Sequence, residues 1–106
     1  MKTKAPTIHI TLLSCVLTIC AHNARTPGAM RYSAYMTDGM NRVISHHFAK
    51  AQPFVRDEVL VMDDTEIHLH DGAALLAEEF LRNSQAFVDA PRQLNAFSNP
   101  ELRAIA

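Results

Sequence analysis

The chain has 106 residues, 48% of them hydrophobic and 20% charged, with a formal net charge of −1. This length and composition fit a single domain over residues 1–106 and exclude a disordered, repetitive or collagen-like chain. The charges are sorted along the chain, because residues 1–56 carry seven basic side chains and one acid, whereas residues 57–106 carry ten acids and three arginines.

The first predicted element spans residues 7–20. Seven of these fourteen residues are β-branched. That composition favours a strand over a helix, because branched side chains lose rotamers in a helical turn. We expect a strand that is buried on both faces and that bends near Leu13-Ser14. A helix over the same residues is the alternative.

The same apolar stretch follows Lys2 and Lys4, as the apolar region of a secretory signal would. Pro6 interrupts the approach, however, and cleavage after Ala21 would place Ile19 where a small residue is required. We therefore expect a retained core strand in a cytoplasmic protein that does not enter a membrane. A secreted or periplasmic protein with a cleaved N-terminal signal is the alternative.

A helix is predicted next. It begins at Thr26-Pro27, an N-cap followed by a proline in the first turn, and it runs to about Lys50. Six residues recur at a spacing of three or four and would form its inward face: Met36, Met40, Val43, Ile44, His47 and Ala51. Gly39 weakens the middle of this helix, and Pro53 ends it.

A hairpin and two more helices complete the predicted order. The hairpin joins residues 59–62 to residues 66–70 through an acidic turn. Asp71 is the predicted N-cap of a second helix over residues 72–89, and residues 98–101 match a capping box that starts a last short helix.

These elements predict an α+β fold in the order β-α-β-β-α. Its sheet has three strands, with two helices packed on one face and a short C-terminal helix, an arrangement that buries every apolar stripe at once. Cys15 and Cys20 lie five residues apart and point away from each other on a strand or a helix, so they cannot form a disulfide together. Two free cysteines suit a reducing compartment.

Alternating side chains on the hairpin suggest a metal site. Glu66, His68 and His70 point to the same face of a strand, about 7 Å apart in succession. Imidazole and carboxylate groups at this spacing can ligate zinc or iron, with His9 on the first strand as a further ligand. A polar solvent-facing side of the hairpin is the alternative, and it is the interpretation we prefer.

Catalytic and nucleic-acid-binding motifs are absent from the sequence. No serine lies in a glycine-flanked elbow, and three glycines are too few for a phosphate-binding loop. The basic residues of the first half are spread out, whereas proteins that grip phosphates concentrate them. We therefore predict a protein that is not an enzyme, needs no cofactor and does not bind nucleic acid directly.

The acidic segment carries the functional prediction, because Asp57 to Glu79 contains eight carboxylates and no lysine or arginine. A dense acidic surface can dock on a basic groove, including one that binds nucleic acid. We predict a protein-binding module, an inhibitor or adaptor that a phage or mobile element could encode, for a larger basic partner. An exposed hairpin edge could also form a homodimer. The predicted contact residues are Asp57, Glu58, Asp63, Asp64, Glu66, Glu78 and Glu79.

Overall fold

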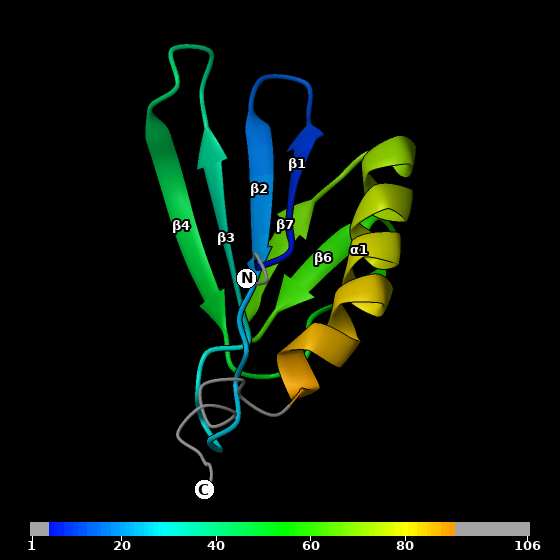
Figure 1. Ribbon diagram of the computed structural model, residues 1–106. Helices are drawn as coiled ribbons and strands as arrows, with labels where there is room; N and C mark the ends of the chain where they lie inside the picture. The colour runs from blue at the N-terminus through cyan, green and yellow to red at the C-terminus, as the bar shows by residue number, and fades with distance from the viewer. Residues whose placement is uncertain (1–4, 91–106) are drawn as a thin grey trace, which may run out of the picture.

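The computed structural model describes residues 5–90, which form seven strands followed by one helix (Figure 1). All strand pairs are antiparallel and belong to two separate sheets. The elements are β1 (Thr7–Thr11), β2 (Val16–Ala21), β3 (Tyr32–Thr37), β4 (Val43–Ala49), β5 (Phe54–Arg56), β6 (Val59–Met62), β7 (Thr65–His68) and α1 (Asp71–Asp89).

Sheet A consists of β1, β2, β3 and β4 in sequence order. Its register places Ile10 opposite Leu17 and Leu17 opposite Met36, so one face of the sheet carries the apolar side chains. The turn between β3 and β4 is built by Asp38, whose carboxylate accepts hydrogen bonds from the backbone N–H groups of Met40 and Arg42.

Sheet B consists of β5, β6 and β7. A two-residue loop joins β5 to β6, and both of its residues have positive φ, 53° at Asp57 and 61° at Glu58. This is the type I′ geometry that matches the twist of a hairpin, although Asn-Gly is the usual sequence for it. The acidic segment therefore begins in a strained turn.

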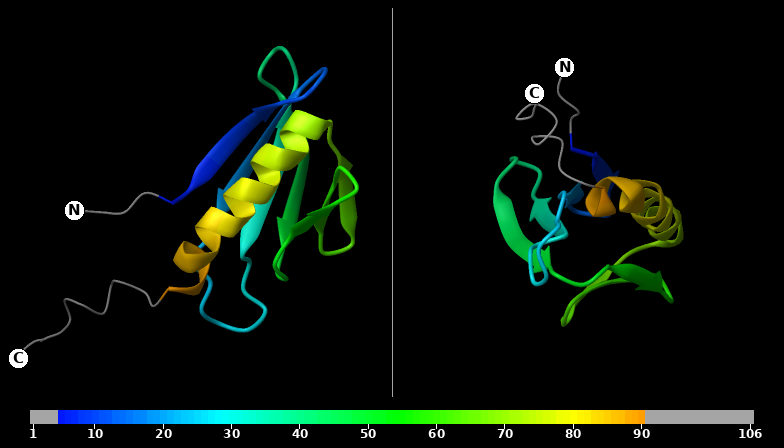
Figure 2. Two further views of the ribbon diagram at one scale, coloured as in Figure 1. Left: turned by 90° about the vertical axis from the view of Figure 1, so that its right-hand side faces the viewer. Right: turned by 60° about the horizontal axis from the view of Figure 1, so that its bottom comes forward.

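Helix α1 packs against strands of both sheets, so the core lies between three surfaces (Figure 2). The helix contributes mostly small side chains to this core, including Ala73, Ala77 and Ser84. Tyr32 of β3 is fully buried, and its hydroxyl lies 2.7 Å from that of Ser84. The Tyr32 ring also meets the edge of Phe80 at a centroid distance of 6.3 Å.

The C-terminal end of α1 is held by the segment between β2 and β3. The Asn23 side-chain amide donates hydrogen bonds of 2.8 Å to the carbonyl oxygens of Phe87 and Ala90. Arg31 forms an ion pair of 2.8 Å with Asp89. The two hydrogen bonds from Asn23 satisfy carbonyl groups that a helix end leaves without an internal partner.

The predicted three-stranded sheet with two helices is wrong. Residues 26–50 contain no helix: they form β3, the Asp38 turn and β4. Met40, Val43 and Ile44, which the helical spacing placed inward, are exposed. The sheet uses a different alternation, in which Tyr32, Ala34 and Met36 share the inner face. Gly39 lies in the turn between the strands and not inside a helix.

The other predicted elements are confirmed in part. Residues 7–20 do form strands, but the expected bend is a complete reversal between β1 and β2. The second hairpin and the helix after it are confirmed, and sequence reasoning missed β5 as a third strand of that sheet. The N-cap of α1 is His70, not Asp71. The predicted helix at residues 98–101 lies outside the described residues.

Asp63 ties the two sheets together. It lies in the β6–β7 turn with a φ of 54°, and its carboxylate accepts hydrogen bonds from the backbone N–H groups of Lys50 and Ala51, just after β4. These two hydrogen bonds, made at 2.9 and 3.0 Å, are the main reason that the pKa of Asp63 lies below its ordinary value of 3.8.

We expect Asp63→Asn to destabilise the protein at pH 7 by about 1 kcal/mol, allowing for solvent screening, because an amide accepts only one of the two hydrogen bonds well. A carboxyl with a lowered pKa in the folded state contributes stability above its unfolded pKa and loses that contribution as the pH falls. The difference from wild type should therefore shrink between about pH 4 and pH 2.

Urea unfolding followed by circular dichroism across this pH range measures the effect. Asp64→Asn is the matched control, because it removes a neighbouring exposed carboxylate that accepts no hydrogen bond from residues 5–90. Equal destabilisation by the two variants would contradict the role assigned to Asp63.

Candidate functional site

Five acidic side chains lie on the N-terminal half of α1 and on the β5–β6 turn beside its start. Asp71 and Glu78 lie seven residues apart on α1 and so share a face of the helix, with Glu79 beside them. Asp57 and Glu58 come from the β5–β6 turn, and the Glu58 side chain contacts that of Asp71. We call these five residues, with the exposed leucines described next, the acidic patch.

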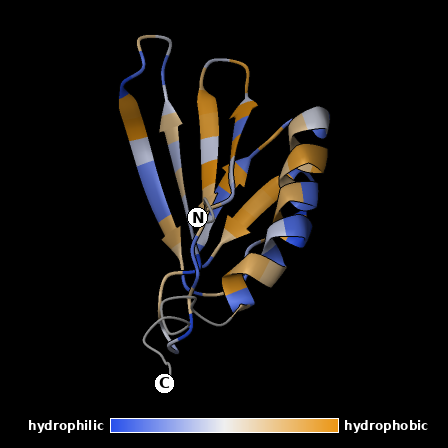
Figure 3. Cartoon of the chain, in the orientation of Figure 1, coloured by the Kyte–Doolittle hydropathy of each residue, from blue (hydrophilic) through white to orange (hydrophobic). Residues whose placement is uncertain are grey.

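Two leucines lie within the acidic patch. Leu75 is 67% exposed and Leu76 is 46% exposed. Leu76 does not face the core, because Ala73, Ala74 and Ala77 fill the inward face of the helix. Figure 3 shows hydrophobic and hydrophilic stretches alternating along α1. Leu75 lies four residues after Asp71 and three before Glu78, so it occupies the same face as both acids.

Glu58 and Asp71 lie close enough for their carboxyl groups to interact directly. A hydrogen bond between the two carboxyl groups and the charge of Asp71 raise the pKa of Glu58 above its ordinary value of 4.5. The backbone carbonyl of Glu58 also accepts a hydrogen bond of 2.8 Å from the N–H of Leu69. The backbone therefore holds Glu58 next to the start of the helix.

No basic side chain among residues 5–90 neutralises these acids through an ion pair. The ion pairs in this part of the chain are Arg31–Asp89 and Arg42–Asp38, and neither involves an acid between Asp57 and Glu79. The charge of Lys50 acts on Asp63, which lies outside the patch, so the five acids of the patch have no ion-pair partner among the described residues.

The other three predicted contact residues lie elsewhere. Asp63 and Asp64 are in the β6–β7 turn, at the opposite end of β6 from Glu58, and the carboxylate of Asp63 is already used by the backbone after β4. Glu66 lies on β7, on the face of sheet B that points away from Ile67 and the core. The seven residues predicted from sequence are thus divided, and only four of them join the acidic patch.

The histidines proposed as metal ligands are also separated. His70 caps α1: its Nδ1 accepts the N–H of Ala73, and its Nε2–H donates to the carbonyl oxygen of Thr11. His9 lies on sheet A with its Nδ1 at 2.9 Å from the hydroxyl of Thr18. Within residues 5–90, no three histidine, cysteine, aspartate or glutamate side chains are placed to hold a metal ion together.

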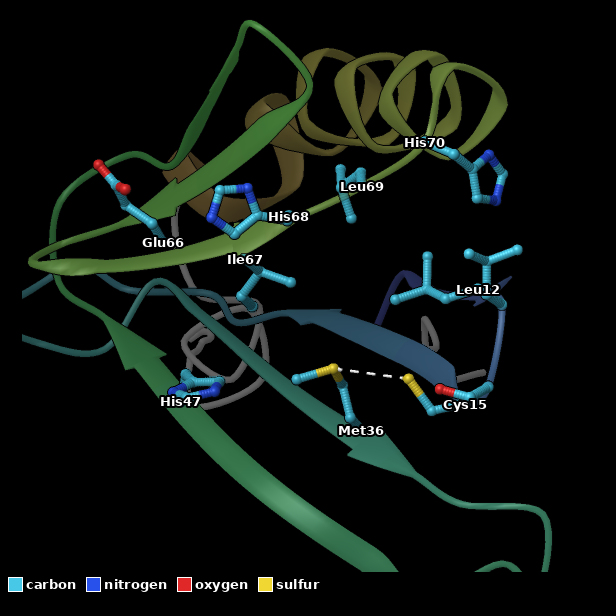
Figure 4. Close-up of a pocket in the computed structure, with 11 residues that line it drawn as sticks. Leu12, Cys15, Met36, His47, Glu66, Ile67, His68, Leu69 and His70 are labelled. Atoms are coloured by element: carbon cyan, nitrogen blue, oxygen red, sulfur yellow. Dashed lines mark hydrogen bonds between the residues drawn. The ribbon is translucent and has the colours of Figure 1, made fainter.

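A groove of about 460 Å³ separates β7 from the inner face of sheet A (Figure 4). Apolar side chains line much of it, with Met36 on one wall and Ile67 and Leu69 on the other. The Cys15 thiol donates to the thioether sulfur of Met36 at 3.8 Å. No described base is hydrogen-bonded to this thiol, so the groove lacks the nucleophile–base pair of a cysteine enzyme.

The groove brings together residues that are distant in sequence. Its remaining lining residues come from the β1–β2 turn, β4 and the end of β7: Leu12, Leu13, Ser14, His47, Glu66, His68 and His70. Sequence analysis missed this groove, because it depends on how sheet A and sheet B are oriented. The acidic patch and its leucines, in contrast, follow helical spacing that the sequence displays.

Comparison with protein-family models, with curated proteins and with solved structures finds no match for this chain. Within the described residues, no helix is long and apolar enough to cross a bilayer.

We expect Glu58→Gln to stabilise the protein near neutral pH, because it removes the repulsion between Glu58 and Asp71. A carboxyl with a raised pKa in the folded state costs stability as the pH rises through that pKa, so the gain should grow from about pH 4 to pH 6. Thermal unfolding at both pH values measures it. Glu78→Gln, which removes a charge from the same patch, is the control and should give a smaller dependence on pH.

Glu58→Gly should raise the melting temperature by a few degrees more than Glu58→Gln at pH 6. Glycine relieves the same repulsion and also adopts a φ of 61° without the steric cost that other residues pay. A lower melting temperature for Glu58→Gly than for Glu58→Gln would show that the turn is not strained.

Proposed function

We propose that this protein is a non-enzymatic binding module that docks the acidic patch on a basic surface of a larger protein, as an inhibitor or adaptor in the cytoplasm. One observation supports the proposal most strongly. The patch combines five carboxylates without a described ion-pair partner, on the helix and the adjoining turn, with two exposed leucines of the helix beside them.

The two kinds of side chain would contribute differently to binding. Carboxylates around the rim attract a basic surface and raise the rate of association. Leu75 and Leu76 would supply the apolar centre that most interfaces need for affinity. The partner that fits is therefore a basic groove with an apolar pocket, a description that includes grooves that bind nucleic acid.

The fold argues against the alternative in which residues 1–21 are a cleaved signal. Ile10, Leu17 and Ile19 are buried in the core between the sheets and the helix. Removal of residues 1–21, as a cleaved signal would require, would take β1 and β2 out of sheet A. The metal-binding alternative gains nothing from the structure, because no three of the described candidate ligands are placed to hold one metal ion together.

We expect a variant with Asp57, Glu78 and Glu79 all changed to lysine to lose its partner. The test is affinity capture from a lysate of the cells that produce the protein, followed by measurement of the dissociation constant with the purified partner. Reversal of three charges should weaken binding at least tenfold, and wild-type affinity should fall as salt rises from about 50 to 300 mM.

The control variant changes Asp64 and Glu66 to lysine, which alters charge on exposed acids outside the patch. It should bind like the wild type. A second variant, Leu75→Ser with Leu76→Ser, should slow association little and speed dissociation. Equal binding by the patch variant and the control, with no effect of salt, would refute the proposal.

A further inference from the structure

Strand β4 forms an open edge of sheet A. Among the described residues it pairs with β3 alone, whereas β1 at the other edge is contacted by α1. Figure 1 shows β4 and α1 on opposite sides of the molecule. An open edge presents backbone N–H and C=O groups that another strand can use.

The β4 edge lacks the usual protection against such pairing. Residues 43–49 include no charged residue and no proline, the devices that edge strands commonly carry. Three apolar side chains of β4 are more than half exposed: Val43 at 61%, Ile44 at 58% and Phe48 at 53%. Ile44 forms a bulge in β4, because Met36 of β3 pairs with Ser45 and Thr37 pairs with Val43. Ser45–Ala49 is therefore the regular part of the edge.

The outward side chains of this regular stretch form an aromatic cluster. His46 lies between Tyr35 and Phe48, with ring centroids 5.8 Å from Tyr35 and 4.5 Å from Phe48. His46 and Phe48 are both exposed, so an apolar surface continues from the strand edge onto the outer face of sheet A.

We propose that a second copy of this chain pairs antiparallel with β4 and extends sheet A across a two-fold axis near His47. In this register the outer faces of the two copies of sheet A form one continuous surface, and Phe48 of each copy lies opposite His46 of the other. The two exposed aromatic clusters would then pack together, and the N–H and C=O groups of both edges would be satisfied.

The charges at the ends of β4 are compatible with a second copy. Arg42 is paired with Asp38 at one end, and the charge of Lys50 acts on Asp63 at the other. Antiparallel pairing thus brings two locally balanced ends together, without like-charge repulsion.

Helix α1, which carries much of the acidic patch, lies across the molecule from β4. The dimer would therefore present two acidic patches, and a partner with two binding sites would bind the dimer more tightly than the monomer.

The expected interface is small. Pairing of five residues with a few flanking side chains lies below the size of a permanent dimer, so dissociation on the order of micromolar to hundreds of micromolar is expected. Sedimentation equilibrium from about 1 µM to 1 mM should show the average mass of the wild type rising from 11.8 kDa toward twice that value.

Phe48→Lys should keep the protein monomeric over the same range, because it removes the central apolar contact and adds a charge to the edge. Phe54→Lys is the matched control: Phe54 is 46% exposed and lies on the outer strand of sheet B, so this variant should dimerise like the wild type. Circular dichroism establishes that both variants are folded.

Hydrogen exchange of the wild type gives an answer that needs no variant. Amides of Ser45–Phe48 that face the free edge should exchange more slowly at 1 mM than at 1 µM, by a factor that follows the dimer fraction. A wild type that stays monomeric at 1 mM, or that dimerises through the edge controlled by Phe54, would overturn the proposal. No binding partner is involved, so this result is independent of the function proposed for the acidic patch.

Discussion

The packing of α1 against both sheets is the interaction on which the rest of the molecule depends. Sheet A and sheet B each have one apolar face, and neither can bury it without a cover. The helix covers both with a narrow face of small residues, including Ala73 and Ala77. The small side chains allow close approach of the helix to the strands, and Tyr32 of β3 reaches the hydroxyl of Ser84. Leu81 and Val88 add larger buried groups from the helix.

This arrangement decides which surfaces remain free. Ala73, Ala77 and Leu81 of α1 face the core, whereas Leu75 and Leu76 point away from it and remain exposed beside the acids. The strand farthest from the helix, β4, is left with an open edge. The acidic patch and the β4 edge therefore have a common origin, because among residues 5–90 one helix covers the inner faces of both sheets and leaves its own outer face and the β4 edge uncovered.

The acids of this protein divide into two groups with different physical roles. Asp38 and Asp63 hold turns and strand ends by accepting backbone hydrogen bonds, and these bonds lower the pKa of both carboxyls. Glu58 has the opposite environment, since Asp71 raises its pKa. Acids that stabilise the fold accept hydrogen bonds from backbone N–H groups, whereas Glu58 and Asp71 of the patch repel each other.

The sequence by itself determined the elements whose residue pattern fits only one kind of secondary structure. The hairpin around Asp63, the helix after it and the helical spacing of Asp71, Leu75 and Glu78 could all be read from residue order. Residues 26–50 could not, because their apolar spacing suits a helix and two strands alike, and pairing with β2 selects the strands. Tertiary structure alone decided the separation of Asp63 and Glu66 from the patch, the groove beside Met36 and the open edge of β4. Each of these depends on how two sheets meet one helix, and that geometry is set by contacts between residues far apart in the chain.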